Sequence, residues 1–251
     1  MKKSLLMIMA VLAVATLAIS SPLFAATQAG TAASVEGDVK VMKPTDSTPH
    51  VLKTGDPVFM GDKIETGSNG RLQVKLLDET EFILGASSAM AIDEFVYDPA
   101  TKDGKVKTSM LKGIFRIISG EIAHKNNENM VVNLPAGTMG FRGTEVVGII
   151  NGARTEIMLI GPVGVGRISV TNLVNGEVVT VDIDEAGFGT IVNGPNSAPI
   201  AVFQVTPAQL AAAAQQLGLP PFNLAGLPDV DTLDTQVQSE ESSRDISSTT
   251  A

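Results

Sequence analysis

The chain contains no cysteine and no tryptophan, a single tyrosine and only two histidines. Without cysteine there can be no disulfide, no thiol chemistry and no lipid-modified cysteine. With so few large aromatic side chains, a platform for stacking sugar rings or nucleic-acid bases lacks its usual parts. His50 and His124 stand in polar stretches with no acid, serine or second histidine at useful spacing. Their sequence context therefore favours solvated loops over catalytic or metal-binding roles.

Other catalytic and cofactor motifs are also absent. No Gly-x-Ser-x-Gly nucleophile elbow occurs, and the glycine-rich stretch 161–166 has neither the helix nor the lysine of a phosphate-binding loop. Asp229, Asp231 and Asp234 lack the loop glycine and closing glutamate of a calcium site. We therefore predict a protein that is not an enzyme and that uses no cofactor and no metal.

Residues 1–25 have the pattern of a secretory signal peptide. Two lysines precede an uncharged apolar run from Leu5 to Ile19, and small residues lead to a cleavage site after Ala25 or Ala26. An uncleaved N-terminal anchor is the alternative, although the run is short for a membrane span. Cleavage would place the mature protein in the periplasm or outside the cell. It would also change the formal charge from −9 to −11, which disfavours nucleic acid as a partner.

A six-residue phrase repeats near the start of the mature chain. Gly55, Gly61 and Gly67 recur at intervals of six, aspartate follows the first two, and Val58 and Ile64 occupy the same apolar position. A turn, an acid that bonds its own backbone and one inward side chain per step are typical of short β segments.

The region from residue 34 to about 205 has a β pattern. Leu72, Val74 and Leu76 alternate with polar residues, which is typical of a half-buried strand. Asn151-Gly152 and Asn175-Gly176 predict two hairpins with type I′ turns, and 188–192 is predicted to be the last strand. A polar connection is expected over 124–129, between two strands.

The C-terminal part changes in character. Pro207 and Gly218 bracket an alanine- and glutamine-rich segment, which predicts one short helix over 208–217. A proline-rich linker should follow to residue 228, and the acidic, serine- and threonine-rich residues 229–251 should be disordered. We divide the chain into a signal peptide (1–25), a β domain (26–148), a β-hairpin extension of the same body (149–205), a helix with its linker (206–228) and a tail (229–251).

Arg142 is the most distinctive single residue. It stands in Gly140-Phe141-Arg142-Gly143-Thr144-Glu145, where glycines allow close backbone approach to a guanidinium fork. Two interpretations stay open. Arg142 could form an internal ion pair with Glu145, Asp56 or Asp62, or it could recognise an external anion. In the second case the candidate binding residues come from the Arg-Gly-Thr turn and from the Gly-Asp turns of the repeat. They are Arg142, Gly143, Thr144 and Glu145 in the first, and Asp56 and Asp62 in the second.

These segments together resemble the FecR domain family over about 35–148. The resemblance rests on the repeat 55–66, the strand 71–77 with its following turn, and three further motifs: Phe95–Pro99, Leu111–Gly120 and Pro135–Glu145. Two departures occur. Asp78-Glu79-Thr80 stands where the family usually has Asp-Gly-Thr, and Leu134-Pro135-Ala136-Gly137 replaces a Thr-Pro-x-Ala stretch.

The resemblance implies an all-β, twisted β-solenoid or sandwich-like domain that is not an enzyme and lies on the envelope side of the membrane. Family members often relay signals from outer-membrane iron-siderophore uptake to a cytoplasmic sigma factor. Such regulators carry a cytoplasmic domain before their membrane span, whereas only Met1–Ser4 precede the apolar run here. We therefore expect no direct contact with a sigma factor.

The leading hypothesis is an exported module that binds an envelope or outer-membrane protein or a ligand. Signal sensing is one role that such a module could have. Two routes are available: strand addition at an open sheet edge, or docking of the glycine-containing turns. The alternative is a structural or surface-assembly protein without a discrete ligand. The sequence leaves the oligomeric state open.

Overall fold

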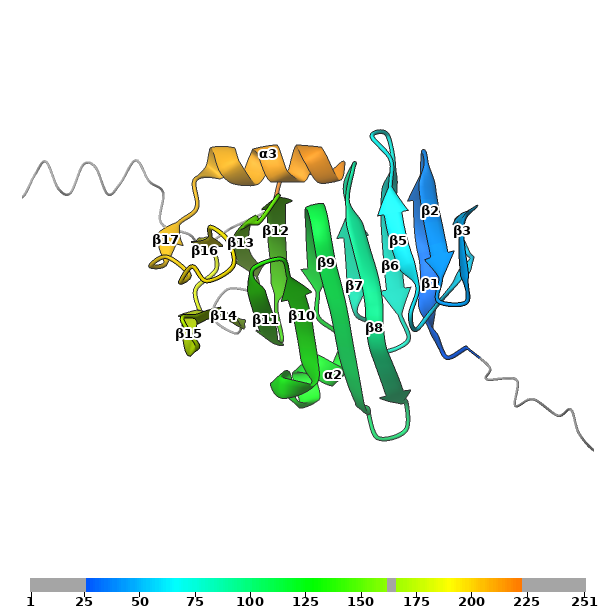
Figure 1. Cartoon of the computed structure of the whole chain (residues 1–251), viewed down its shortest axis with the longest axis horizontal. Helices are drawn as coiled ribbons and strands as arrows, with labels where there is room; N and C mark the ends of the chain where they lie inside the picture. The colour runs from blue at the N-terminus through cyan, green and yellow to red at the C-terminus, as the bar shows by residue number, and fades with distance from the viewer. Residues whose placement is uncertain (1–25, 162–165, 223–251) are drawn as a thin grey trace, which may run out of the picture.

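The computed structural model describes residues 26–161 and 166–222. The predicted signal peptide, the tail 229–251 and the acids at 229–234 lie outside these residues, as does most of the glycine-rich stretch 161–166. More than half of the described residues lie in strands and few lie in helices, which confirms the all-β prediction (Figure 1). Its elements are β1 (Gln28–Glu36), β2 (Val39–Lys43), β3 (Asp46–Val51), β4 (Pro57–Phe59), β5 (Lys63–Thr66), β6 (Arg71–Leu76), β7 (Glu81–Leu84), β8 (Ala89–Asp98), β9 (Asp103–Ile118), α2 (Glu121–Lys125), the 3-10 turn η1 (Asn127–Asn129), β10 (Met130–Leu134), β11 (Gly137–Arg142), β12 (Glu145–Asn151), β13 (Arg154–Gly161), β14 (Arg167–Val174), β15 (Glu177–Ile183), β16 (Phe188–Val192), β17 (Phe203–Gln204) and α3 (Pro207–Leu217).

The strands form two layers that share β9. Sheet A has the order β4-β1-β6-β7-β9-β12-β13-β16-β17, and sheet B has the order β3-β2-β5-β8-β9-β10-β11-β14-β15. The first half of β9 pairs with β8 and β10, and its last six residues pair with β12. Gly113, with φ +87°, lies where β9 passes from one layer to the other. A side chain there would strike Ser88, so glycine permits the crossing.

The main core fills the space between the layers. Alternate residues of sheet A, such as Val74 and Phe82, meet alternate residues of sheet B, such as Ile92 and Phe141, in one buried cluster. Val58 and Ile64 of the repeat are both fully buried in this core. They reach it from different layers, because β4 belongs to sheet A and β5 to sheet B. Of the two predicted architectures, a β-solenoid and a sandwich-like domain, the sandwich-like one therefore describes the fold.

A second, smaller core lies on the outer face of sheet A, under α3 (Figure 1). The predicted helix is confirmed: Thr206 and Gln209 form a capping box, and Gly218 ends the helix with φ +71°. Leu210, Ala213 and Leu217 pack on outward side chains of sheet A. Leu219 and Phe222 also contact this cluster, so the first residues of the predicted linker belong to the folded body.

Three local predictions need correction. The polar connection 124–129 is in part helical, because α2 and η1 occupy it. The β pattern begins at Gln28, before residue 34. Asn175-Gly176 forms the predicted turn, with φ +52° and +87°, but Asn151 still pairs with Arg154. The turn between β12 and β13 is therefore Gly152-Ala153, and of these two only Gly152 has a positive φ.

Candidate binding site

The aspartates of the repeat stabilise their own turns. Asp56 accepts a hydrogen bond from the backbone N–H of Lys53 (2.8 Å), and Asp62 accepts one from the N–H of Phe59 (2.9 Å). The Asp62 carboxylate is completely buried and also pairs with Lys43 at 2.7 Å. Both carboxylates therefore hold the backbone in place, as the predicted turn chemistry requires.

The residues after Arg142 form a tight structural turn. Gly143 has φ +56°, and a Cβ at this position would lie 2.9 Å from the His124 ring. Thr144 is buried. Its N–H donates to Ser119 Oγ (2.7 Å), and its hydroxyl donates to the Gly161 carbonyl (2.6 Å). These contacts hold the start of β12 against β9 and β13.

Glu145 pairs with Arg116, at 2.7 Å between Oε1 and Nε, on the outer face of sheet A. The Arg116 guanidinium also lies over the Phe222 ring, 5.7 Å from its centroid. Among the described residues, no ion pair joins Arg142 to Glu145, Asp56 or Asp62. Three strands of sheet B separate β5, beside Asp62, from β11, which carries Arg142. The structure thus keeps 142–145 together but does not bring them to the Gly-Asp turns.

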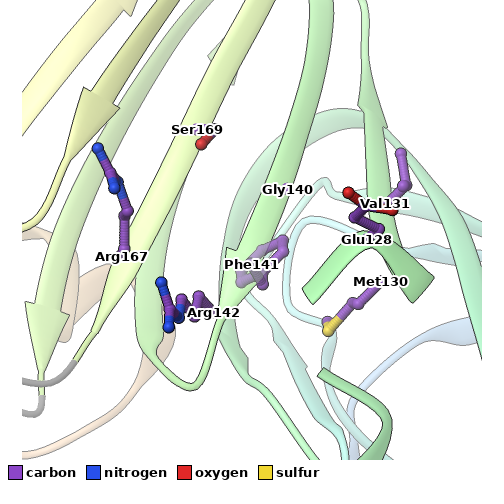
Figure 2. Close-up of a pocket in the computed structure, with 8 residues that line it drawn as sticks. All are labelled: Glu128, Met130, Val131, Gly140, Phe141, Arg142, Arg167 and Ser169. Carbon is purple, nitrogen blue, oxygen red and sulfur yellow. The ribbon is translucent and has the colours of Figure 1, made fainter. Parts of the chain in front are cut away.

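Arg142 instead lines a hollow on the outer face of sheet B (Figure 2). The hollow has a volume of about 220 Å³ and is lined by Glu128, Met130, Val131, Gly140, Phe141, Arg142, Arg167 and Ser169. Its position follows from register, because Val131, Gly140 and Ser169 are neighbours across β10, β11 and β14. Sequence reasoning missed Glu128, Arg167 and Ser169, since their proximity depends on pairing between distant segments.

A further feature is the open edge strand β15. Of its seven residues, Glu177, Val178, Thr180 and Asp182 are exposed, and Val178 retains 71% of its accessible surface. Its ladder partner is β14. The sequence alone indicates the charge of this segment, because it contains no lysine, arginine or histidine between Arg167 and Arg244. β15 and the described residues that follow it therefore contribute no positive charge of their own.

Two described carboxyl groups, those of Asp78 and Asp46, illustrate how their surroundings shift a pKa. Burial raises the pKa of Asp78, against opposing hydrogen bonds from Thr80. Hydrogen bonds from Thr48 and His50 lower the pKa of the exposed Asp46 to about 2, so an acid does lie within reach of His50, contrary to the expectation from the sequence. Within 26–161 and 166–222, no three histidine or acidic side chains are grouped to hold a metal ion. No helix in the same ranges is long and apolar enough to cross a membrane.

Comparison with known proteins confirms the resemblance to the FecR family for part of the chain. Residues 62–161 match the family model described as FecR protein. The match includes the turn at 142–145 and the hairpin β12–β13. No curated protein matches the chain significantly. The match therefore places a FecR domain within the β body of this chain.

Similar solved structures resemble only part of the chain. A cell surface anchoring domain is 30% identical to this chain, with a TM-score of 0.24. The aligned part covers 25% of this chain and 82% of that domain. Two structures of a candidate anti-sigma factor from Parabacteroides distasonis are 18% identical, with TM-scores of 0.44 and 0.43. Each covers 61% of this chain, which in turn spans 64% of their length.

Proposed function

Because the chain carries a FecR domain, we propose that it is an exported, non-enzymatic protein that binds another protein of the cell envelope by strand addition at β15. The observation that carries this proposal is the open edge of sheet B. An exposed edge strand presents unpaired N–H and C=O groups to any extended segment that approaches it.

The other outer strands in the described part of the chain are poor templates. β3 contains Pro49, β4 has three residues and begins with Pro57, and β17 has two residues. β15 has seven residues, Glu-Val-Val-Thr-Val-Asp-Ile, with neither proline nor lysine. Proline and a short length are two usual means of protecting an edge from pairing, and β15 has neither.

The hairpin register identifies the backbone groups that face the edge. In a two-residue hairpin the flanking pair, here Val174 and Glu177, is hydrogen-bonded, and such pairs alternate along the ladder. Val178, Thr180 and Asp182 therefore direct their N–H and C=O groups away from β14. The N–H of Leu173, opposite Val178, bonds the Asn172 side chain instead, which agrees with this assignment.

The charge of this region specifies the partner segment. β15 carries Glu177 and Asp182, and Asp184 and Glu185 follow it; Asp182 is paired with Arg167 of β14, and the segment itself contains no basic residue. Val179 and Val181 are half-buried. A complementary strand should carry lysine or arginine on one face and β-branched apolar residues on the other. Its binding should weaken as salt rises.

Replacing Thr180 by proline tests the proposal. Thr180→Pro removes an N–H that faces the edge but no ladder bond to β14, whereas Thr180→Val keeps the N–H and serves as the matched control. A protein captured from an envelope fraction by the wild type would be purified and titrated against each variant. We expect Thr180→Pro to weaken binding about tenfold or more and Thr180→Val to stay near the wild type.

Amide exchange gives an independent measurement on the same complex. Binding should protect the amides of Val178, Thr180 and Asp182, and should leave those of Val179 and Val181 unchanged. Equal binding by Thr180→Pro and the wild type, with equal melting temperatures, would rule out strand addition. If sedimentation shows that the wild type self-associates and Thr180→Pro does not, surface assembly replaces partner binding as the function.

A further inference from the structure

Gly140 lies at the centre of the hollow on sheet B, which is called the Gly140 hollow below. This hollow is a separate site from the open edge at β15. A Cβ built on Gly140 meets no atom within 4 Å, and its φ is not positive. Glycine is therefore required neither by the backbone nor by close packing at this position. Its effect is to leave open space between Val131 and Ser169, its neighbours on β10 and β14.

Two arginines stand at one end of this space. Arg142 lies directly opposite Arg167 in the β11–β14 register. Like charges in opposed positions destabilise a sheet unless they are compensated. Asp182 compensates Arg167, at 2.9 Å, and also accepts a hydrogen bond from Ser169. Among the described residues, no ion pair or hydrogen bond engages the Arg142 side chain.

The other side of the hollow carries the opposite charge. Figure 2 shows both arginine side chains on one side of Gly140 and Glu128 on the other. Between them the lining is largely apolar: Val131 is half-buried on the outer face, and Met130 and Phe141 belong to the core beneath it. Small-molecule sites commonly combine such an apolar lining with a few polar groups, and a volume near 220 Å³ suits a ligand of amino-acid size.

We propose that the Gly140 hollow binds a small zwitterion, with its carboxylate at Arg142 and Arg167 and its ammonium group at Glu128. A guanidinium fork binds a carboxylate through paired hydrogen bonds, and a carboxylate accepts from an ammonium group. The ligand class is that of free amino acids and very short peptides.

The experiment is a series of amide chemical-shift titrations of the isotope-labelled protein at low ionic strength. The zwitterionic probes are glycine, β-alanine, γ-aminobutyrate and glycylglycine, in which the charges stand progressively further apart. Acetate and methylamine carry one charge each. We expect at least one zwitterion to bind about tenfold more tightly than either single-charge probe and to shift the amides of Gly140, Val131 and Ser169. The best probe also distinguishes free amino acids from peptides.

Three variants assign the contacts. Gly140→Val should fill the space, since a Cβ there meets no atom within 4 Å, and should abolish binding, and Arg142→Gln should weaken it about tenfold. Glu128→Gln should reduce the affinity for the zwitterion to that for acetate. Arg154→Gln changes an exposed arginine on β13 and should bind like the wild type. If no zwitterion binds more tightly than acetate, or if Gly140→Val binds normally, the proposal is wrong. Thr180→Pro leaves the hollow intact, so the two proposals fail separately.

Discussion

Leu210 allows a quantitative test of how α3 is held. Its side chain is 3% exposed and lies in the cluster between α3 and the outer face of sheet A. Truncation to alanine removes buried carbon atoms and leaves a cavity, at a cost of about 2–5 kcal/mol in well-packed cores. Because α3 covers one side of a sheet and can move inward, we expect a loss of about 3 kcal/mol in the free energy of unfolding.

Urea unfolding followed by circular dichroism is the appropriate assay, since the chain has no tryptophan. Gln215→Ala is the matched control, because Gln215 lies on the exposed face of the same helix and should change stability by less than about 0.5 kcal/mol. The Leu210→Ala loss should lower the melting temperature by about 6–12 °C for a body of this size. A loss as small as that of Gln215→Ala would show that α3 does not stabilise the β body.

Two further predictions concern the turn after β6. Glu79 occupies the usual glycine position of the family motif and has φ +69°, so Glu79→Gly should raise the free energy of unfolding by about 0.5–1 kcal/mol. Glu79→Ala keeps a Cβ at that φ and should not raise it. Equal effects of the two variants in urea unfolding would show that the backbone at Glu79 is not strained. Asp78 is fully buried and its pKa is raised, so the carboxyl group holds a proton more tightly in the native protein than in the unfolded chain. Its contribution to the free energy of unfolding therefore falls as the pH rises from the ordinary pKa of 3.8 through the higher pKa of the native state. The stability of the wild type relative to Asp78→Asn should therefore decrease across that window, and a difference independent of pH would contradict the assignment.

Local chemistry made much of the fold predictable. The alternation at 72–76, the turn at Asn175-Gly176 and the helix between Pro207 and Gly218 all depend on residues close in sequence, and each appears in the structure. Asn151-Gly152 failed because a turn can shift by one residue while the strands keep a compatible register. The short helix α2 was not visible, since five residues are too few to show a helical period.

The candidate site was predictable only in part. Arg142 was identified from its glycine-rich setting, but its neighbours Arg167 and Glu128 come from other strands and turns. The interpretation of Arg142 as the internal partner of Glu145 is not supported, because Arg116 reaches that carboxylate from β9 across the β9–β12 ladder.

The sequence by itself determined most strand-forming segments, the turn at Asn175-Gly176, the helix α3 and the resemblance to the FecR family, since these follow from side-chain alternation, backbone preferences and motif order over short distances. Tertiary structure alone decided that β9 serves both layers, that β15 is left as an open edge, and that a glycine lies between two arginines and a glutamate. Those features depend on which distant strands become neighbours, and that choice is made by burying both layers' apolar faces against each other.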